Sequence, residues 1–340
     1  MASRHGKLLP LAILSALLLG MTLLALHAGD YDLGLGDLFR LTKARIMGDP
    51  VEASLKVPSI ILFKVRFPRV LLAIGAGLSL GVAGAAYQAC FRNPLVEPYI
   101  LGVSSGAAAG AALAIVFPRL FPQGQLASFM LALLAVWASY GLATSKGETP
   151  AVALVLSGII IGALFSAFVG VMKYLAMDSQ LREITFWLMG GLYYATWGDA
   201  FVTLGAGIPI LVALSLQGWK LNVLTLGDEE AKSLGLNPRR FRLLVVAAAT
   251  LAAAFSVSTC GIVAWVGLMI PHAARLFLGP DHRALMVGSG ILGAFYLLAC
   301  DTVARTISQA EIPLGIVTSV VGAPYLVWLL RSRGRIIYGS

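Results

Sequence analysis

The chain has 340 residues, of which 59% are apolar and only 12% are charged. Soluble domains are typically about 45–50% apolar and about 25% charged, so this composition excludes a water-soluble globule and a disordered chain. The formal net charge of +9 does not require a nucleic-acid partner, because the cytoplasmic loops of membrane proteins collect Lys and Arg.

Ten apolar segments follow one another along the chain, and each is close to the roughly 20 residues that cross a bilayer as a helix. A basic N-terminus precedes the first, and a polar stretch (29–64) separates it from the second. The ten segments are approximately 8–28, 67–91, 100–118, 125–144, 151–176, 200–217, 241–259, 262–278, 284–304 and 312–330. We therefore predict an all-α, polytopic membrane protein with about ten transmembrane helices, forming a single transmembrane domain over residues 1–340.

Ten spans place both termini on the same side of the membrane, and the charge pattern favours the cytoplasm for that side. Basic residues are frequent in the inside-facing stretch 220–242 and in the C-terminal tail 331–335, as expected of cytoplasmic segments. The outside-facing stretch 40–69 is also rich in basic residues. The excess of Lys and Arg on the cytoplasmic side therefore comes from the other loops.

Small residues recur at four-residue spacing within several of the apolar segments. Examples are Gly77 with Gly81, Gly102 with Gly106 and Gly110, and Gly158 with Gly162. In lipid, small residues let helix backbones approach closely, so we interpret these glycines as packing positions. The three cysteines, Cys90, Cys260 and Cys300, lack metal-ligand spacing and are interpreted in the same way.

The sequence offers little chemistry of its own. No phosphate-binding Gly-x-x-x-x-Gly-Lys-Ser/Thr loop occurs, which excludes ATP hydrolysis by that route. The span centres carry almost no charge, which weakens the alternative of an ion-coupled secondary transporter. Residues 102–106 read Gly-Val-Ser-Ser-Gly, and with His272 they suggest an intramembrane serine hydrolase. However, this motif opens an apolar helix, where Ser usually acts as a cap.

The loops between the apolar segments are more informative. Two prolines and Asn93 form a tight turn after the second segment, where proline stops a helix. The inside stretch 219–242 mixes leucines with acidic and basic residues, a pattern typical of short amphipathic helices on a membrane face. On pattern alone, this stretch is either a solvated surface or a docking surface for a cytoplasmic partner.

These loops resemble those of the permease subunits of type II ABC importers, the FecCD-like family that takes up iron–siderophores, haem, cobalamin and some oxyanions. The resemblance covers nearly the whole chain from Arg66 onward, in ordered blocks. They are Arg-Phe-Pro-Arg (66–69), Asn-Pro-Leu-Val-Glu-Pro (93–98) with Leu-Gly-Val-Ser-Ser-Gly (101–106), Phe-Trp-Leu-Met-Gly-Gly (186–191), Leu-Gly-Asp-Glu-Glu-Ala-Lys-Ser-Leu-Gly (226–235), Gly-Leu-Met-Ile-Pro-His-Ala-Ala-Arg (267–275) with Asp-His-Arg (281–283), and 301–305 with Glu-Ile-Pro-Leu-Gly (311–315) and Gly-Ala-Pro (322–324).

The resemblance implies a homodimeric permease that is not an enzyme, binds no cofactor and works in the cell inner membrane. ATP is used by two cytoplasmic ATP-binding cassette subunits, and a periplasmic or lipid-anchored binding protein delivers the substrate. The family's coupling helices match Leu226, Gly227, Asp228, Glu229, Ala231, Leu234 and Gly235 in the segment 219–242. Its cytoplasmic gate matches Asn93, Pro94, Leu95, Glu148 and Thr149, and its binding-protein docking positions match Arg66, Arg69 and Arg305.

The implied substrate is an iron complex, either a ferric siderophore or haem, or a related metal chelate such as cobalamin. The chain departs from the common pattern at one place. Many relatives have Gly-Pro-Ile-Gly-Phe before Val-Gly-Leu, whereas this chain has Gly-Ile-Val-Ala-Trp at 261–265. The change removes a helix-limiting proline and adds a bulky aromatic, and it keeps a molybdate- or tungstate-type oxyanion as the alternative substrate.

Overall fold

The computed structural model describes residues 4–29, 31, 33–144, 150–308 and 310–338. These residues form helices joined by short turns, and no strand occurs among them. The all-α prediction is therefore confirmed.

The spanning helices agree with the ten predicted segments. Seven helices are long and apolar enough to cross a membrane, namely α1 (Arg4–His27), α4 (Phe67–Phe91), α6 (Gly124–Ala143), α7 (Ala151–Leu175), α9 (Trp197–Leu216), α12 (Pro238–Cys260) and α14 (His282–Thr306). The other three predicted segments correspond to the short apolar helices α5 (Val103–Val116) and α13 (Val266–Leu278) and to the apolar part, Leu314–Leu329, of α15 (Leu314–Tyr338). Most helix ends lie within a few residues of the predicted limits, and α4 matches its segment at both ends.

Two regions differ from the prediction. The stretch predicted only as a polar connection is largely helical, because α2 (Leu35–Met47), η1 (Ala53–Leu55), α3 (Lys56–Ile60) and the π-helical turn η2 (Ile61–Arg66) precede α4. From Ala53 the chain continues as helix into α4, so the second apolar helix begins well before residue 67. A separate helix, α8 (Asp178–Met189), also lies between α7 and α9.

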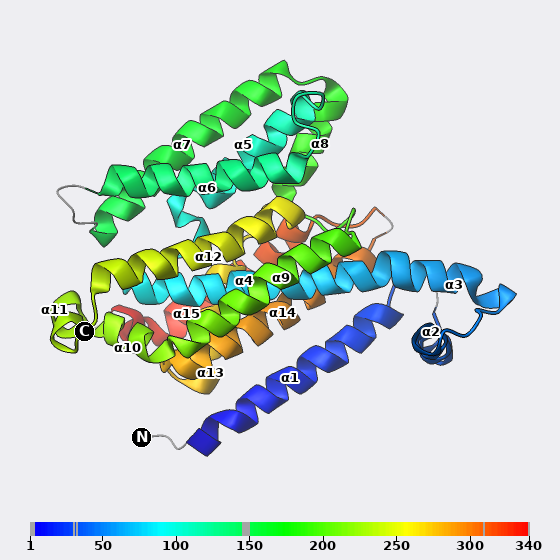
Figure 1. Ribbon diagram of the computed structural model, residues 1–340, viewed down its shortest axis with the longest axis horizontal. Helices are drawn as coiled ribbons and strands as arrows, with labels where there is room; N and C mark the ends of the chain where they lie inside the picture. Colours follow the sequence, from blue (N-terminus) through cyan, green and yellow to red (C-terminus); the bar gives the residue numbers. More distant parts are fainter. Residues whose placement is uncertain (1–3, 30, 32, 145–149, 309, 339–340) are drawn as a thin grey trace.

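The core of the molecule surrounds α4, which is buried along almost its whole length. α14, α12 and α9 pack around it, and α5, α6 and α7 form a neighbouring group at the top of Figure 1. The small residues have the predicted role at several crossings. A Cβ added at Gly77 or Gly81 would penetrate the backbone of α14, and one added at Gly106 or Gly110 would penetrate α6. Close backbone approach therefore holds these helix pairs together.

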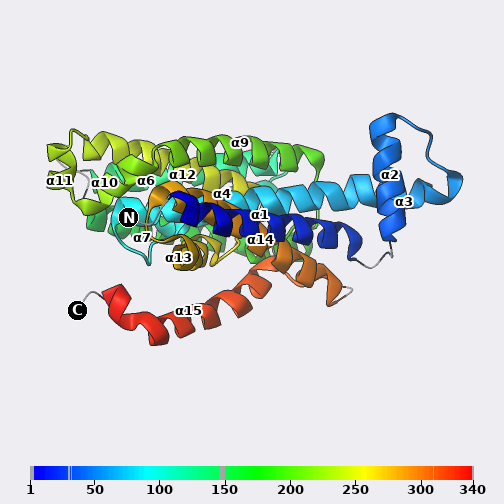
Figure 2. The same ribbon diagram turned by 90° about the horizontal axis from the view of Figure 1, so that it is seen from below.

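The remaining short helices gather at the two ends of the bundle. α10 (Gly218–Leu226) and α11 (Asp228–Ser233) lie at one end, together with the start of α1 and the finish of α15 (Figures 1 and 2). α2 and α3 lie at the opposite end. We call these the α11 end and the α2 end. α1 therefore begins, and α15 ends, at the same end of the bundle, as an even number of spans requires.

Candidate functional site

Two short helices and two glycines build the segment predicted to couple to an ATPase. Gly227 separates α10 from α11 with φ of +143°, and Gly235 follows α11 with φ of +80°. Both values lie in the region where residues with a Cβ are strained. The glycines therefore allow two sharp bends, which make α10 and α11 a compact projection at the α11 end. We call residues 218–237 the coupling segment.

The coupling segment presents apolar side chains outward. Leu226 is 63% exposed and Leu234 is 52% exposed, whereas Ala231 and Leu224 are fully buried beneath them. The side chain of Glu229 is 85% exposed and pairs with Lys232. α11 is thus anchored by buried residues and flanked by two exposed leucines.

One carboxylate connects the coupling segment to the helical bundle. Asp281, which precedes α14, accepts hydrogen bonds of 2.8 Å from Asn222 of α10 and from Lys7 of α1. The Asn222 side-chain oxygen in turn accepts a bond from the backbone N–H of His282. Burial alone would raise the pKa of Asp281, but the hydrogen bonds from Lys7 and Asn222 outweigh it and lower the pKa to about 2. Asn222 and Lys7 were not among the predicted site residues, because no local pattern shows that they meet.

A second ionic contact connects α11 to the helices behind it. Asp228 lies 2.8 Å from Arg242 of α12 and 3.5 Å from Arg92, which follows α4. Arg242 also donates to the carbonyl of Cys90 at 3.3 Å. An open pocket of about 890 Å³ lies beside these contacts, and residues from the end of α4, the start of α7 and the coupling segment line it. These contacts join α11 to the end of α4 and the start of α12.

The turn predicted as a cytoplasmic gate lies at the same end and is held by two contacts. The Asn93 side chain accepts a hydrogen bond of 2.9 Å from the backbone N–H of Leu95, as in other Asx-turns. The carbonyl of Pro94 lies 2.8 Å from Nε2 of His272 in α13. Burial raises the pKa of Glu97, which follows in the same loop. The other two predicted gate residues, Glu148 and Thr149, lie outside the described residues.

The serine and histidine that suggested a hydrolase have other partners. Ser105 donates its hydroxyl to the carbonyl of Gly102 at 3.1 Å, and the His272 ring contacts Pro94. Ser105, which follows the central serine of the motif, Ser104, thus makes a local contact in the first turn of α5. Among the described residues, the imidazole of His272 contacts the Pro94 carbonyl rather than either serine.

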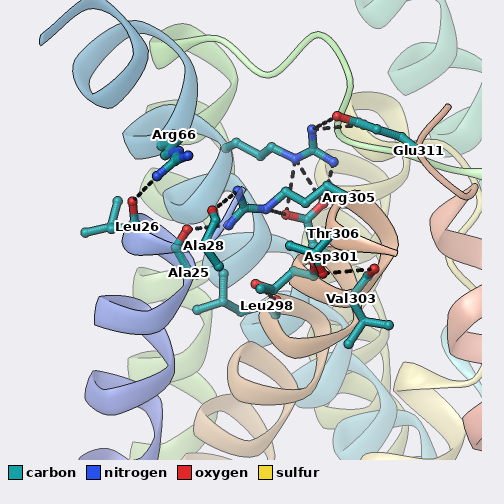
Figure 3. Close-up of polar contacts among 12 residues, drawn as sticks. Ala25, Leu26, Ala28, Arg66, Leu298, Asp301, Val303, Arg305, Thr306 and Glu311 are labelled. Carbon is teal, nitrogen blue, oxygen red and sulfur yellow. Dashed lines mark hydrogen bonds and ion pairs between the residues drawn. The ribbon is translucent and has the colours of Figure 1, made fainter. Parts of the chain in front are cut away.

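The three arginines predicted to dock a binding protein gather at the α2 end. Arg66 donates to the carbonyls of Leu26 and His27 at 2.8 and 2.7 Å, and Arg305 donates to those of Ala28 and Ala25 (Figure 3). The last carbonyls of a helix have no intrahelical partner. These two guanidinium groups therefore cap the C-terminus of α1, where the helix dipole also favours a cation.

The third arginine, Arg69, bridges two carboxylates. Its guanidinium makes hydrogen bonds of 2.9–3.1 Å to Asp301 of α14 and of 2.9–3.0 Å to Glu311, in the turn before α15. Figure 3 shows Asp301 and Glu311 approaching the same guanidinium. The Asp301 side chain is 1% exposed, but that of Glu311 is 31% exposed. The network therefore reaches the surface at Glu311.

All three arginines are thus largely buried, with exposures of 4% for Arg66 and 8% for Arg69 and Arg305. The sequence indicated basic groups on an open face, whereas their guanidinium groups make internal contacts in this structure. Their common location agrees with one site at the α2 end, and their geometry gives them a structural role in it.

The unusual tryptophan connects the start of α13 with α15. Trp265 has φ of +75° and donates from its indole N–H to the Ser319 hydroxyl at 3.1 Å. Its side chain lies against Gly322, where an added Cβ would come within 2.7 Å of it. The residue that departs from the common pattern therefore packs against the last spanning helix.

The family of this chain is shown by comparison with known proteins. The model of the FecCD transport family matches residues 17–332. The chain belongs to this family, and it is a multi-pass membrane permease of an ABC importer.

Individual relatives agree on the class but differ in the substrate that they are named for. The chain is 41% identical to a probable iron chelatin transport system permease of Helicobacter pylori, over 81% of this chain and 84% of the relative. It is 36% identical to the molybdate import permease MolB of Haemophilus influenzae, over 94% of this chain and 96% of the relative. Others are named as cobalamin and hemin permeases.

A solved structure supports the same fold. It is described as an inward-facing conformation of a metal-chelate type ABC transporter, and it is 32% identical to this chain. The two superpose with a TM-score of 0.84, covering 94% of this chain and 98% of the solved one. The helical arrangement around α4 is therefore that of an ABC importer permease.

Proposed function

We propose that this permease imports an iron chelate, either a ferric siderophore or haem, or a related metal chelate such as cobalamin. The names of the iron chelatin relative and of the metal-chelate transporter support this substrate class. A molybdate-type oxyanion is the second candidate, because the molybdate permease matches nearly the whole chain. The chain breaks no bond in its substrate and binds no cofactor.

The permease works as a homodimer in the lipid of the cytoplasmic (inner) membrane. Two ATP-binding cassette subunits bind at the α11 end, which faces the cytoplasm together with both termini. A periplasmic or lipid-anchored binding protein docks at the α2 end. The exposed leucines of the coupling segment and its ionic connections to α1, α4, α12 and α14 carry this assignment.

Transport proceeds by alternating access, with ATP binding and hydrolysis supplied by the partner subunits. Closure of the ATPase dimer displaces α11, and the Asp228 and Asn222 contacts carry this movement to the spanning helices. The cytoplasmic gate comprises Asn93, Pro94, Leu95, Glu148 and Thr149. The permease contributes two helix packings, and its partners shift the balance between them.

Docking involves the arginine cluster of Arg66, Arg69 and Arg305. Arg66 and Arg305 shape the docking face by fixing the end of α1, and the buried Arg69 balances the charge of Glu311, where the network reaches the surface. Charges at the rim of an interface mainly steer and orient a partner.

The decisive experiment is ATP-dependent uptake by the reconstituted permease with its ATPase and binding protein. Ferric siderophore, haem, cobalamin and molybdate are compared as labelled substrates. We expect uptake of an iron chelate that requires ATP and the binding protein and that survives collapse of ion gradients. Uptake driven by an ion gradient without ATP would contradict the function, and uptake of molybdate alone would contradict only the substrate.

A further inference from the structure

The helix α2 exposes an apolar stripe that nothing in the chain covers. Leu35, Phe39 and Ile46 are 68%, 72% and 80% exposed, whereas Leu41 is 1% exposed and packs toward the core. The spacing of four and seven residues places the three exposed side chains on one helix face. α2 is therefore apolar both on the side that packs and on a side that faces away from the bundle.

Cations flank this stripe. Arg40 and Lys43 are exposed, and no carboxylate of the described residues lies within 4 Å of either one. Arg45, in the last turn of α2, lies 5.7 Å from the ring of Phe63. Exposed cations beside an apolar stripe match a partner that is negatively charged and apolar at once.

The position of α2 identifies that partner. In Figure 2, α2 runs across the long axis of the bundle, just beyond the end of α1. Only residues 28–34 separate the two helices, and Arg66, which binds the end of α1, directly precedes α4. α1 itself is mostly exposed along its apolar surface. The stripe therefore lies beside the end of a spanning helix whose apolar surface is exposed, on a helix that runs across the bundle axis.

We propose that α2 is an interfacial helix that binds anionic phospholipid in the leaflet at the α2 end. Leu35, Phe39 and Ile46 enter the upper acyl-chain region, and Arg40 and Lys43 contact lipid phosphates. Helices with this combination of an apolar face and flanking cations lie in the membrane interface. Anionic lipid fits both observations, because it offers phosphates to the two exposed cations and acyl chains to the stripe at the end of an exposed span.

The proposal rests on the proposed function only for the identity of the leaflet, which is the periplasmic one if the α11 end is cytoplasmic. Lipid binding by α2 is independent of ATP, substrate and binding protein. Failure of transport would therefore leave it untouched. The leaflet is checked separately, because a membrane-impermeant thiol reagent applied to whole cells labels Glu52→Cys only if the α2 end faces outward.

The first test measures the depth of the stripe. A nitroxide spin label is attached to Phe39→Cys or Ile46→Cys in the full chain, and the protein is reconstituted in vesicles of 70% phosphatidylcholine and 30% phosphatidylglycerol. The native cysteines are buried, and wild-type protein treated in the same way gives the background. We expect both labels to be more accessible to oxygen than to an aqueous nickel chelate, with the reverse at the control position Glu52→Cys.

The second test measures the role of the cations. Retention of phosphatidylglycerol relative to phosphatidylcholine is compared by native mass spectrometry for wild type and for Arg40→Gln/Lys43→Gln. We expect the preference to fall roughly fivefold per cation removed. Arg119→Gln, which removes an exposed cation from the turn between α5 and α6 at the same end, is the matched control and keeps the preference.

Two results would overturn the proposal. One is a spin label at Phe39→Cys that is fully accessible to the nickel chelate in vesicles, because the stripe would then lie in water. If added binding protein shielded that label, the stripe would be a protein docking face. The other is a lipid preference in the double variant equal to that of Arg119→Gln.

Discussion

Asp281 shows how much of the coupling geometry depends on one side chain. Its two carboxylate oxygens bind Lys7 of α1 and Asn222 of α10, and it also accepts from the backbone N–H that opens α14. Three elements that are distant in sequence therefore meet at one charged group. A helix N-terminus favours an anion, which gives the position a local reason for Asp as well.

The lowered pKa of Asp281 predicts a specific pH dependence. The folded-state pKa of about 2 lies below the ordinary value of 3.8 for an aspartate, so the ionised carboxylate stabilises the fold. This contribution is complete above about pH 4 and is lost as the pH falls toward 2. We expect Asp281→Asn to lower the midpoint temperature of thermal unfolding in detergent at pH 6. Between pH 4 and 2, that midpoint should fall less in Asp281→Asn than in the wild type. Asp49→Asn, in the exposed turn after α2, is the control, and an unchanged acid slope in Asp281→Asn would contradict the prediction.

The two carboxylates on Arg69 predict unequal effects of substitution. Removing one partner of a buried ion pair costs about 3–5 kcal/mol, whereas exposed pairs contribute about 1 kcal/mol or less. Asp301 is buried and Glu311 is partly exposed. We therefore expect Asp301→Asn to be strongly destabilising and Glu311→Gln to be nearly neutral, as measured by unfolding with sodium dodecyl sulfate in mixed micelles. Equal losses of stability in Asp301→Asn and Glu311→Gln would contradict this prediction.

Among the elements, α11 combines an exposed surface with firm internal contacts. Ala231 is buried and Asp228 is held by Arg242, whereas Leu234 points outward. A helix of six residues has little stability of its own, so its position depends on these contacts and on the bends at Gly227 and Gly235. An ATPase pressing on α11 would therefore move the connected helices rather than unfold the segment.

Leu234→Asp tests this element. A charge at this exposed site leaves the internal contacts intact, so we expect normal insertion and assembly of the permease in the membrane. It places an unpaired carboxylate in the proposed ATPase interface, and uptake per ATP hydrolysed is expected to fall at least tenfold in proteoliposomes. Leu120→Asp makes the same change at an exposed leucine of the opposite end and is expected to leave uptake unchanged. Undiminished uptake by Leu234→Asp would refute the coupling assignment.

At the scale of the whole molecule, the polar contacts are concentrated at the two ends of an apolar bundle. The α11 end joins the coupling segment to the gate turn, and the α2 end joins α1, α4, α14 and the turn before α15 through the arginine cluster. Helices packed through glycine contacts connect these ends as stiff elements. This arrangement suits a permease in which partners on opposite sides bias one common rearrangement.

Docking at the α2 end should respond to the charge balance on Arg69. Glu311→Gln removes the more exposed of its two carboxylate partners, which leaves more positive potential for an acidic partner. We expect the affinity for the binding protein to rise roughly two- to fivefold at low salt and the gain to shrink at high salt. Glu183→Gln makes the same change in net charge on exposed α8 and serves as control. Equal affinities of the two variants, measured by surface plasmon resonance, would exclude Arg69 as a docking charge.

The amino-acid pattern was sufficient for the spans and the packing glycines. Each of these follows from local composition, because a run of apolar residues has few alternatives to a helix in lipid. The helical character of residues 35–66 was missed, since its mixed charges indicated a polar connection. α8 was missed as a separate helix because its residues lack the length and apolarity of a span.

The sequence alone determines that this protein is a bundle of membrane-spanning helices with a short amphipathic segment between two of them, since both properties reside in neighbouring residues. Only the tertiary structure decides which distant side chains meet. Asn222 meets Asp281, and the three arginines turn inward to bind the end of α1 and the carboxylates of α14 and the turn before α15. A buried polar group must find a partner wherever packing provides one, and packing depends on the whole chain.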